Sequence, residues 1–219
     1  MDVFDIIGPV MVGPSSSHTA GAVRIGRVAR VILGEPVIEV DIVFHGSFAK
    51  TYKGHGTDRA VIGGLLGMGT DDPRIKNSLA IAQSQGMKFS FDTADLGDVH
   101  PNTTLIRAYG IDGKKIEVMG SSIGGGSIII KKLNGLDVDF TGDLNTIIVF
   151  HKDAPGAVAS VTNLLAGKRI NIAQMKVFRS RRGGDAVMVI DVDDEPTKDV
   201  VDSISTLSSI KETVVISPV

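Results

Sequence analysis

The last third of the chain alternates strand-like and helix-like patterns in an order that strongly limits its fold. Apolar, β-branched runs mark four strands, and apolar residues at helical spacing mark two helices between them. Asp153 is expected to cap the first helix, which ends at Gly167. The order βαββαβ predicts a ferredoxin-like sandwich. The expected strands cover residues 146–150, 170–178, 186–192 and 213–216, and the second helix opens at residues 195–197.

The first part of the chain is less regular and predicts a separate α+β domain with a mixed, mostly antiparallel sheet. Asp72 and Pro73 supply a cap and an N1 proline for one helical segment. A polar, glycine-containing stretch near residue 140 separates the two parts, so we expect domains at residues 1–140 and 145–219. The other expected elements are helices at 20–33 and 57–66, strands at 38–44, 89–91 and 127–132, and a hairpin of 105–109 with 116–119.

The composition excludes several classes of protein. The 219 residues include 23 basic and 25 acidic side chains, and this net charge of −2 offers no basic excess for a nucleic-acid partner. With 42% hydrophobic and 22% charged residues, the chain can bury a core. The first ten residues are acidic, unlike a signal peptide, and the longest uncharged apolar run, 61–68, is too short to span a membrane. We therefore expect a cytoplasmic protein with no nucleic-acid or membrane partner.

The chain contains no cysteine. It therefore forms no disulfide, offers no thiolate nucleophile and cannot hold an iron–sulfur cluster through its own thiolates. Any chemistry that needs such a cluster must depend on another polypeptide.

Four polar clusters in the first domain contain more functional groups than folding requires. The first, residues 13–19, places Ser15, Ser16, Ser17, His18 and Thr19 where a helix begins. A helix N-terminus presents unpaired N–H groups that suit a carboxylate or a phosphate. The alternative is an N-cap with spare serines, but one hydroxyl group would satisfy that role.

The other three clusters also combine glycine or proline with polar groups. In residues 53–58, glycines flank His55 and let the backbone approach a ligand, although a strand-to-helix turn capped by Thr57 or Asp58 is an equal alternative. His100 and Asn102 flank a rigid proline just before a strand. The fourth cluster, residues 121–127, is a run of flexible donors that can form an anion nest but lacks the spacing of a dinucleotide fingerprint.

Three histidines in such loops raise the question of a metal site. No carboxylate or second histidine lies at the short spacing of a known ligand motif, so we expect no metal ligands in this chain. His45, at the end of a strand, is expected to be structural. The basic turn at residues 179–184 is expected to be a solvated loop.

Taken together, the four clusters resemble the β subunits of bacterial iron–sulfur-dependent L-serine dehydratases along essentially the whole chain. This resemblance implies a first domain related to the allosteric substrate-binding domain of phosphoglycerate dehydrogenase, followed by an ACT domain. It also implies conversion of L-serine to pyruvate and ammonia, with a [4Fe–4S] cluster held by cysteines of a separate α subunit. The lack of cysteine in this chain agrees with a cluster that is bound by another subunit.

The resemblance also implies roles for individual residues. His18 matches the position of the base that removes the α-proton, and the hydroxyl groups beside it would hold the substrate and orient the imidazole. The remaining positions would line the same cleft or contact the α subunit, although related domains bind only an anionic effector. The expected substrate-binding residues are Ser15, Ser16, Ser17, Thr19, His55, Thr57, Asp58, His100, Asn102, Gly124, Gly125 and Gly126.

The second domain resembles ACT modules through residues 151–156 and 169–174. The resemblance places an amino-acid effector against His151, Asp153 and Asn171 and implies self-association of ACT domains. Asp153 can pair with a ligand ammonium group or serve only as the helix cap. A different hypothesis is a non-catalytic serine sensor, but a sensor has little use for the hydroxyl groups beside His18.

Overall fold

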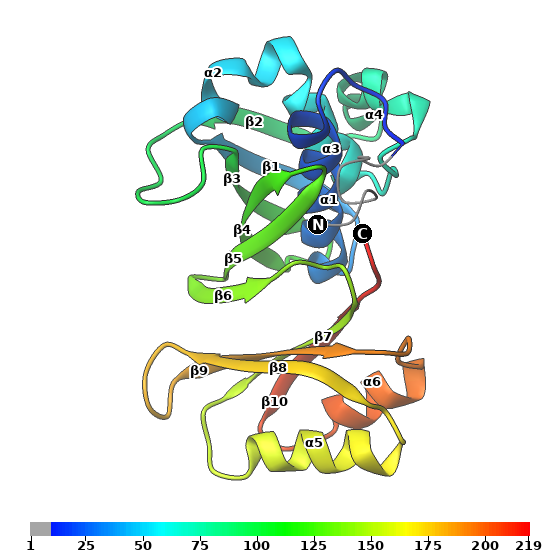
Figure 1. Cartoon of the computed structure of the whole chain (residues 1–219), viewed down its shortest axis with the longest axis vertical. Coiled ribbons are helices and arrows are strands. Elements are labelled where there is room, and N and C mark those ends of the chain that lie inside the picture. Colours follow the sequence, from blue (N-terminus) through cyan, green and yellow to red (C-terminus); the bar gives the residue numbers. More distant parts are fainter. Residues whose placement is uncertain (1–9) are drawn as a thin grey trace. The chain divides into compact units, whose positions relative to one another are not determined.

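The computed structural model describes residues 10–219, and the first nine residues, on which the signal-peptide expectation rests, lie outside this part. The chain forms two compact units, and the boundary between them lies between Asn134 and Gly135. Each unit builds its own helices and strands (Figure 1). Among residues 10–219, no helix has the length and apolarity needed to cross a membrane.

The first unit is built on a sheet whose strands follow the order β2-β1-β3-β4-β5. The β1–β2 pair is parallel, whereas β1–β3, β3–β4 and β4–β5 are antiparallel, which confirms a mixed, mostly antiparallel sheet. The strands are β1 (Val37–Phe44), β2 (Lys88–Thr93), β3 (Thr103–Gly110), β4 (Lys115–Gly124) and β5 (Ser127–Leu133), and a further strand, β6 (Leu136–Phe140), follows the division between the units.

β6 was not predicted, because the stretch near residue 140 was interpreted as the separator between the two domains. Leu136, Val138 and Phe140 alternate with aspartates, a period of two that favours a half-buried strand. The alternation covers only this short strand, and the glycine and acidic residues around it are typical of turns, so the local sequence did not predict a strand here.

The helices of the first unit are α1 (Gly21–Leu33), α2 (Gly46–His55), α3 (Thr57–Leu65) and α4 (Ser78–Ser84), with a π-helical turn η2 (Ser16–Ala20) and a 3-10 turn η3 (Pro73–Asn77). α1 packs against β4 and α3. Two glycines permit the close crossing of α1 and α3, because a Cβ on Gly26 would meet the Val61 carbonyl group and one on Gly64 would meet that of Val23. The expected helices near residues 20–33 and 57–66 are confirmed.

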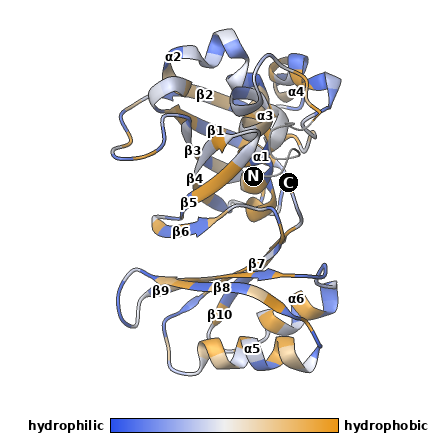
Figure 2. Cartoon of the chain, in the orientation of Figure 1, coloured by the Kyte–Doolittle hydropathy of each residue, from blue (hydrophilic) through white to orange (hydrophobic). Residues whose placement is uncertain are grey.

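α2 was not predicted. Phe48 is its one buried residue, and Figure 2 colours most of α2 white or blue. The sequence of α2 therefore has no apolar periodicity from which a helix could be predicted. The local sequence therefore favoured a strand-to-helix turn as one alternative, where the structure has a junction of two helices. Gly56, with a φ of 71°, ends α2 in the left-handed region and leads into α3.

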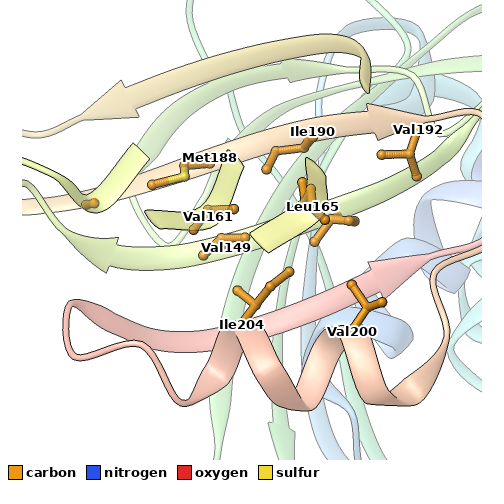
Figure 3. Close-up of a cluster of buried hydrophobic side chains, with 10 residues drawn as sticks. Val149, Val161, Leu165, Met188, Ile190, Val192, Val200 and Ile204 are labelled. Carbon is orange, nitrogen blue, oxygen red and sulfur yellow. The ribbon is translucent and has the colours of Figure 1, made fainter. Parts of the chain in front are cut away.

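The second unit confirms the predicted βαββαβ order. Its sheet has the strand order β10-β7-β9-β8, and all three pairs are antiparallel. Figure 3 shows Val200 and Ile204 pointing from α6 toward Val149 of β7 and Ile190 of β9 in one apolar core. The elements are β7 (Asn145–Lys152), α5 (Ala157–Gly167), β8 (Ile172–Arg179), β9 (Asp185–Val192), α6 (Lys198–Ser205) and β10 (Ile210–Ile216).

Candidate functional site

His18 lies in the π-helical turn η2, which leads directly into α1. Ser15 is the N-cap of this turn, and its hydroxyl oxygen accepts a hydrogen bond from the His18 backbone N–H over 3.3 Å. The prediction that the first cluster begins a helix is therefore confirmed. His18 itself is only 9% exposed, so the turn carries an imidazole into a largely dry environment.

Both ring nitrogens of His18 face hydroxyl groups. The Ser15 Oγ atom lies 3.3 Å from Nδ1, and the Ser47 Oγ atom lies 3.4 Å from Nε2. The Phe48 ring packs against the imidazole with a centroid distance of 5.1 Å. Burial lowers the pKa of His18, and the positive charge of His55 lowers it further. The imidazole is therefore neutral near pH 7 and able to accept a proton.

His55 is the second histidine of the site. It is the last residue of α2, it is exposed, and its ring meets that of His18 at a centroid distance of 4.7 Å. The second cluster is thus brought directly against the first, although the two are distant in the sequence.

Thr57 and Asp58 follow at the start of α3, and both are buried. Burial raises the pKa of Asp58, and this effect outweighs the hydrogen bond that Asp58 Oδ1 accepts from the Arg59 N–H over 2.8 Å. The hydroxyl groups of Thr57 and Thr19 are buried without a hydrogen-bond partner among residues 10–219. Buried polar groups normally find partners, so these hydroxyl groups are candidates to bind a ligand.

The third cluster is linked to His18 through the beginning of α2. The Pro101 carbonyl oxygen accepts hydrogen bonds from the N–H groups of Ser47 and Phe48, over 2.8 and 3.4 Å. His100 is exposed, and its Nδ1 atom accepts the Asn102 N–H over 3.1 Å. The structure thus holds this loop beside the two residues that contact His18, whereas the His100 ring itself bonds within its own loop.

The fourth cluster lies at the end of β4 and in the turn that leads into β5. Ser121 and Ser122 are buried in β4, and the Ser121 hydroxyl group shares a hydrogen bond with that of Thr103 over 2.7 Å. Gly124 ends β4, and Gly125 and Gly126 form the turn into β5, all three with positive φ. The Gly126 carbonyl oxygen accepts a hydrogen bond from Arg24 Nη1 of α1 over 2.8 Å.

Ser47 and Phe48 contact His18 but were missed by the sequence analysis. They follow the end of β1 in a helix that has no clear apolar pattern, so local sequence offered little signal. His45, which precedes them, accepts the Leu96 N–H at Nδ1 over 3.1 Å. Asp95 Oδ1 lies 3.6 Å from the same atom.

In the second unit, His151 is buried on β7. Its Nδ1 atom lies 2.7 Å from the Lys152 carbonyl oxygen, so Nδ1 carries the proton. Nε2 is buried and has no hydrogen-bond partner among the described residues.

Asp153 does not cap α5, because the N-cap is Gly156 with a φ of 87°. Its Oδ2 atom instead accepts hydrogen bonds from the Gly183 N–H and from Arg179 Nη1, each over 3.0 Å. These two interactions lower the pKa of Asp153. Arg179 is exposed, as expected for this basic turn, and its guanidinium group also forms an ion pair with Asp153.

Asn171 lies far from these two residues within one chain. Its side-chain amide donates to Asp193 over 2.7 Å, near the point where Ile172 of β8 pairs with Val192. His151 pairs with Ala186, at the other end of β9. At about 3.3 Å per residue, the two ends are roughly 20 Å apart. One chain alone does not bring the three expected effector residues together.

Metal-binding groups do not gather in the described part of the chain. Among residues 10–219, no set of three or more histidine, aspartate or glutamate side chains is arranged to hold a metal ion. Together with the lack of cysteine, this arrangement does not fit an iron–sulfur cluster bound by this chain.

Comparison with known proteins agrees with this geometry. A family model described as serine dehydratase beta chain matches residues 2–133, and an ACT domain model matches residues 145–208. The chain is 49% identical to a probable L-serine dehydratase, beta chain, of Bacillus subtilis, over 95% of this chain and 94% of that protein. It is 40% identical to the L-serine dehydratase, beta chain, of Peptoniphilus asaccharolyticus, over 92% and 91%.

A more distant relative is matched over only part of its own length. The D-3-phosphoglycerate dehydrogenase of Methanocaldococcus jannaschii is 27% identical over 90% of this chain, but the match covers 37% of that protein. The two beta chains, in contrast, are matched over almost their full lengths. This chain belongs to the serine dehydratase beta chain family.

Proposed function

We propose that this chain is the β subunit of a cytoplasmic L-serine dehydratase, an L-serine ammonia-lyase that converts L-serine to pyruvate and ammonia. The observation that carries the proposal is the buried His18 imidazole, which lies between two serine hydroxyl groups and against His55. The names of the two similar beta chains support the same activity.

In this proposal His18 is the base. A neutral imidazole removes the proton from Cα of L-serine, and the electron pair forms the Cα–Cβ double bond as the bond from Cβ to the hydroxyl oxygen breaks. The hydroxide takes up the proton that His18 gained and leaves as water, which restores the neutral imidazole. The product, aminoacrylate, tautomerises to an imine, which water hydrolyses to pyruvate and ammonia. The lowered pKa of His18 keeps a lone pair available near neutral pH.

The surrounding polar groups bind and orient the substrate. Ser16, Ser17 and the unpartnered Thr19 hydroxyl group lie at the start of a helix, where N–H groups and a partial positive charge favour the substrate carboxylate. Asp58 provides a negative charge suited to the ammonium group. We assign the remaining contacts to Ser15, His55, Thr57, His100, Asn102, Gly124, Gly125 and Gly126.

The [4Fe–4S] cluster expected for such an enzyme is assigned to the cysteines of a separate α subunit, because this chain has none. The ring of His55 is exposed and contacts the buried ring of His18, so a partner that binds over His55 would also complete the site. The active species in this proposal is therefore a heteromer, and the chain alone is inert.

The ACT unit is assigned a regulatory role with self-association. A site that uses His151, Asp153 and Asn171 together needs two copies of the chain, because these residues lie at opposite ends of one sheet. L-Serine is the effector that we propose.

The first experiment measures anaerobic pyruvate formation from L-serine, after iron reconstitution, by the chain alone and by the chain co-expressed with the cysteine-containing protein encoded beside it. Activity only in the pair supports the split enzyme. Full activity of the chain alone contradicts it. Inactivity of both samples together with tight serine binding by the chain would favour the non-catalytic sensor.

A further inference from the structure

Ser47 contacts the candidate base but belongs to none of the four polar clusters. Its Oγ atom lies 3.4 Å from His18 Nε2. It is the second residue of α2, and the next residue, Phe48, packs its ring against the same imidazole. The start of α2 therefore contacts His18 with both a hydroxyl group and an aromatic ring.

The backbone around Ser47 is held on two sides. Its N–H donates to the Pro101 carbonyl oxygen over 2.8 Å, and its own carbonyl oxygen accepts the Thr51 hydroxyl group over 2.8 Å. Gly46 just before it has a φ of 56° and approaches the Pro101 backbone so closely that a Cβ would lie 2.6 Å from the carbonyl oxygen. These contacts fix the position from which the hydroxyl group reaches His18.

On the opposite side of the ring, Ser15 Oγ lies 3.3 Å from Nδ1 and also accepts the His18 backbone N–H. A hydroxyl group can donate or accept a hydrogen bond. With the neutral imidazole, one of Ser15 and Ser47 accepts from the ring N–H and the other donates to the unprotonated nitrogen. With the protonated imidazole, both hydroxyl groups accept. A ring between two such groups can gain a proton without moving.

We propose that Ser47 is a positioning residue for His18, which fixes the ring and accepts the Nε2–H when the imidazole takes up a proton. This inference rests on the proposed function and adds a residue to that site. Hydrogen bonds to a charged donor are stronger than neutral ones, so loss of the Ser47 hydroxyl group costs the protonated ring more than the neutral ring. Ser47→Ala should therefore lower the pKa of His18.

Other charges around η2 remain constant in this comparison. The elements that contact η2 are α1, α2, α3 and β4. Their charged or titratable side chains are Arg24, Arg27 and Arg30 on α1, Lys50, Tyr52, Lys53 and His55 on α2, Asp58 and Arg59 on α3, and Lys115 and Glu117 on β4. Of these, His55 acts on the protonation of His18. A Ser47 variant leaves all of these groups in place, so a changed His18 titration is due to loss of the Ser47 hydroxyl group.

The test is an NMR titration of the histidine rings in the ¹⁵N-labelled full chain, for the wild type, Ser47→Ala, Ser47→Thr and Ser84→Ala. Ser84 is a matched control, because its hydroxyl group donates only within α4, to the Ile81 carbonyl oxygen over 2.7 Å. Ser47→Ala should move the His18 midpoint down by about half a pH unit or more, with altered ring ¹⁵N shifts. Ser47→Thr, which keeps the hydroxyl group, and Ser84→Ala should titrate as the wild type does.

A second readout uses the assembled enzyme. Ser47→Ala should reduce kcat roughly tenfold with little change in KM, and the acidic limb of its pH profile should move down with the His18 midpoint. An unchanged midpoint in Ser47→Ala overturns the proposal, and so does a shifted midpoint with wild-type kcat. If His18→Ala also turns over normally, the proposed function fails, and the titration separates that failure from an error about Ser47.

Discussion

The imidazole rings of His18 and His55 meet edge to face, with their centroids 4.7 Å apart and their planes at 88°. One ring is buried in η2 and the other is exposed at the end of α2. Two positive charges at this distance repel each other, so the pair favours at most one proton. The exposed ring therefore helps to keep the buried one neutral.

Replacement of His18 should abolish most of the turnover. In the assembled enzyme, His18→Ala should reduce kcat for L-serine by roughly 10²- to 10⁴-fold, the usual contribution of a general base. Steady-state pyruvate formation measures this loss, and Ser84→Ala is the control because it lies outside the site. Near-normal turnover would remove His18 from the role of base.

Replacement of His55 should raise the pKa of His18. The charge of His55 lowers that pKa, so His55→Gln removes the repulsion, and the His18 midpoint moves toward its ordinary value of 6.5. The acidic limb of kcat/KM should move to higher pH in parallel. NMR titration of the full chain measures the midpoint, and a downward shift would contradict the edge-on pair as a source of repulsion.

The pKa of His18 also predicts how stability depends on pH. Because the folded value lies below the unfolded value near 6.5, the unfolded chain binds more protons and stability rises with pH. This contribution is complete above about pH 6.5 and is lost as the pH falls through the lowered folded value. Urea unfolding between pH 5 and 8 should show a steeper decline for the wild type than for His18→Gln. Parallel curves would rule out a contribution from His18.

The buried charge of Asp58 should lower the free energy of unfolding at neutral pH, although the carboxylate serves substrate binding. Burial raises its pKa, so the charged carboxylate is less stable in the folded chain than in the unfolded chain. Asp58→Asn keeps an acceptor for the Arg59 N–H and removes the charge, so its Tm at pH 7 should rise while serine turnover falls. Because a raised pKa favours folding at low pH, the gain in Tm should shrink toward pH 4. An unchanged Tm together with full activity would contradict both expectations.

The close crossing of α1 and α3 should depend on Gly64. A Cβ there would meet the Val23 carbonyl group and lie 2.8 Å from the Arg27 backbone nitrogen, and a backbone cannot rotate away as a side chain can. We expect Gly64→Ala to lower the free energy of unfolding by about 3 kcal/mol. Gly54→Ala is the control, because Gly54 is also helical and has open space around its Cβ position. It should raise stability by about 0.5–1 kcal/mol, and equal effects of the two would refute this packing argument.

The sequence predicted the second unit better than the first. Its strands and helices carry long apolar patterns at periods of two and 3.6, which tertiary contacts then reinforce. α2 and β6 were missed because one has little apolar periodicity and the other is short and surrounded by turn residues. Asp153 was misassigned because its partners, Arg179 and Gly183, lie across a hairpin turn that local sequence does not reveal.

The sequence by itself determined the chemistry available to this protein: no thiolate, a histidine among hydroxyl groups at a helix start, and three further polar clusters. Those properties depend on residue type and local order. Only the tertiary structure decided which groups meet, placing His55 and Ser47 against His18 and separating Asn171 from His151. The physical reason is that such contacts arise from the packing of helices and the register of strands, which join residues far apart in the chain.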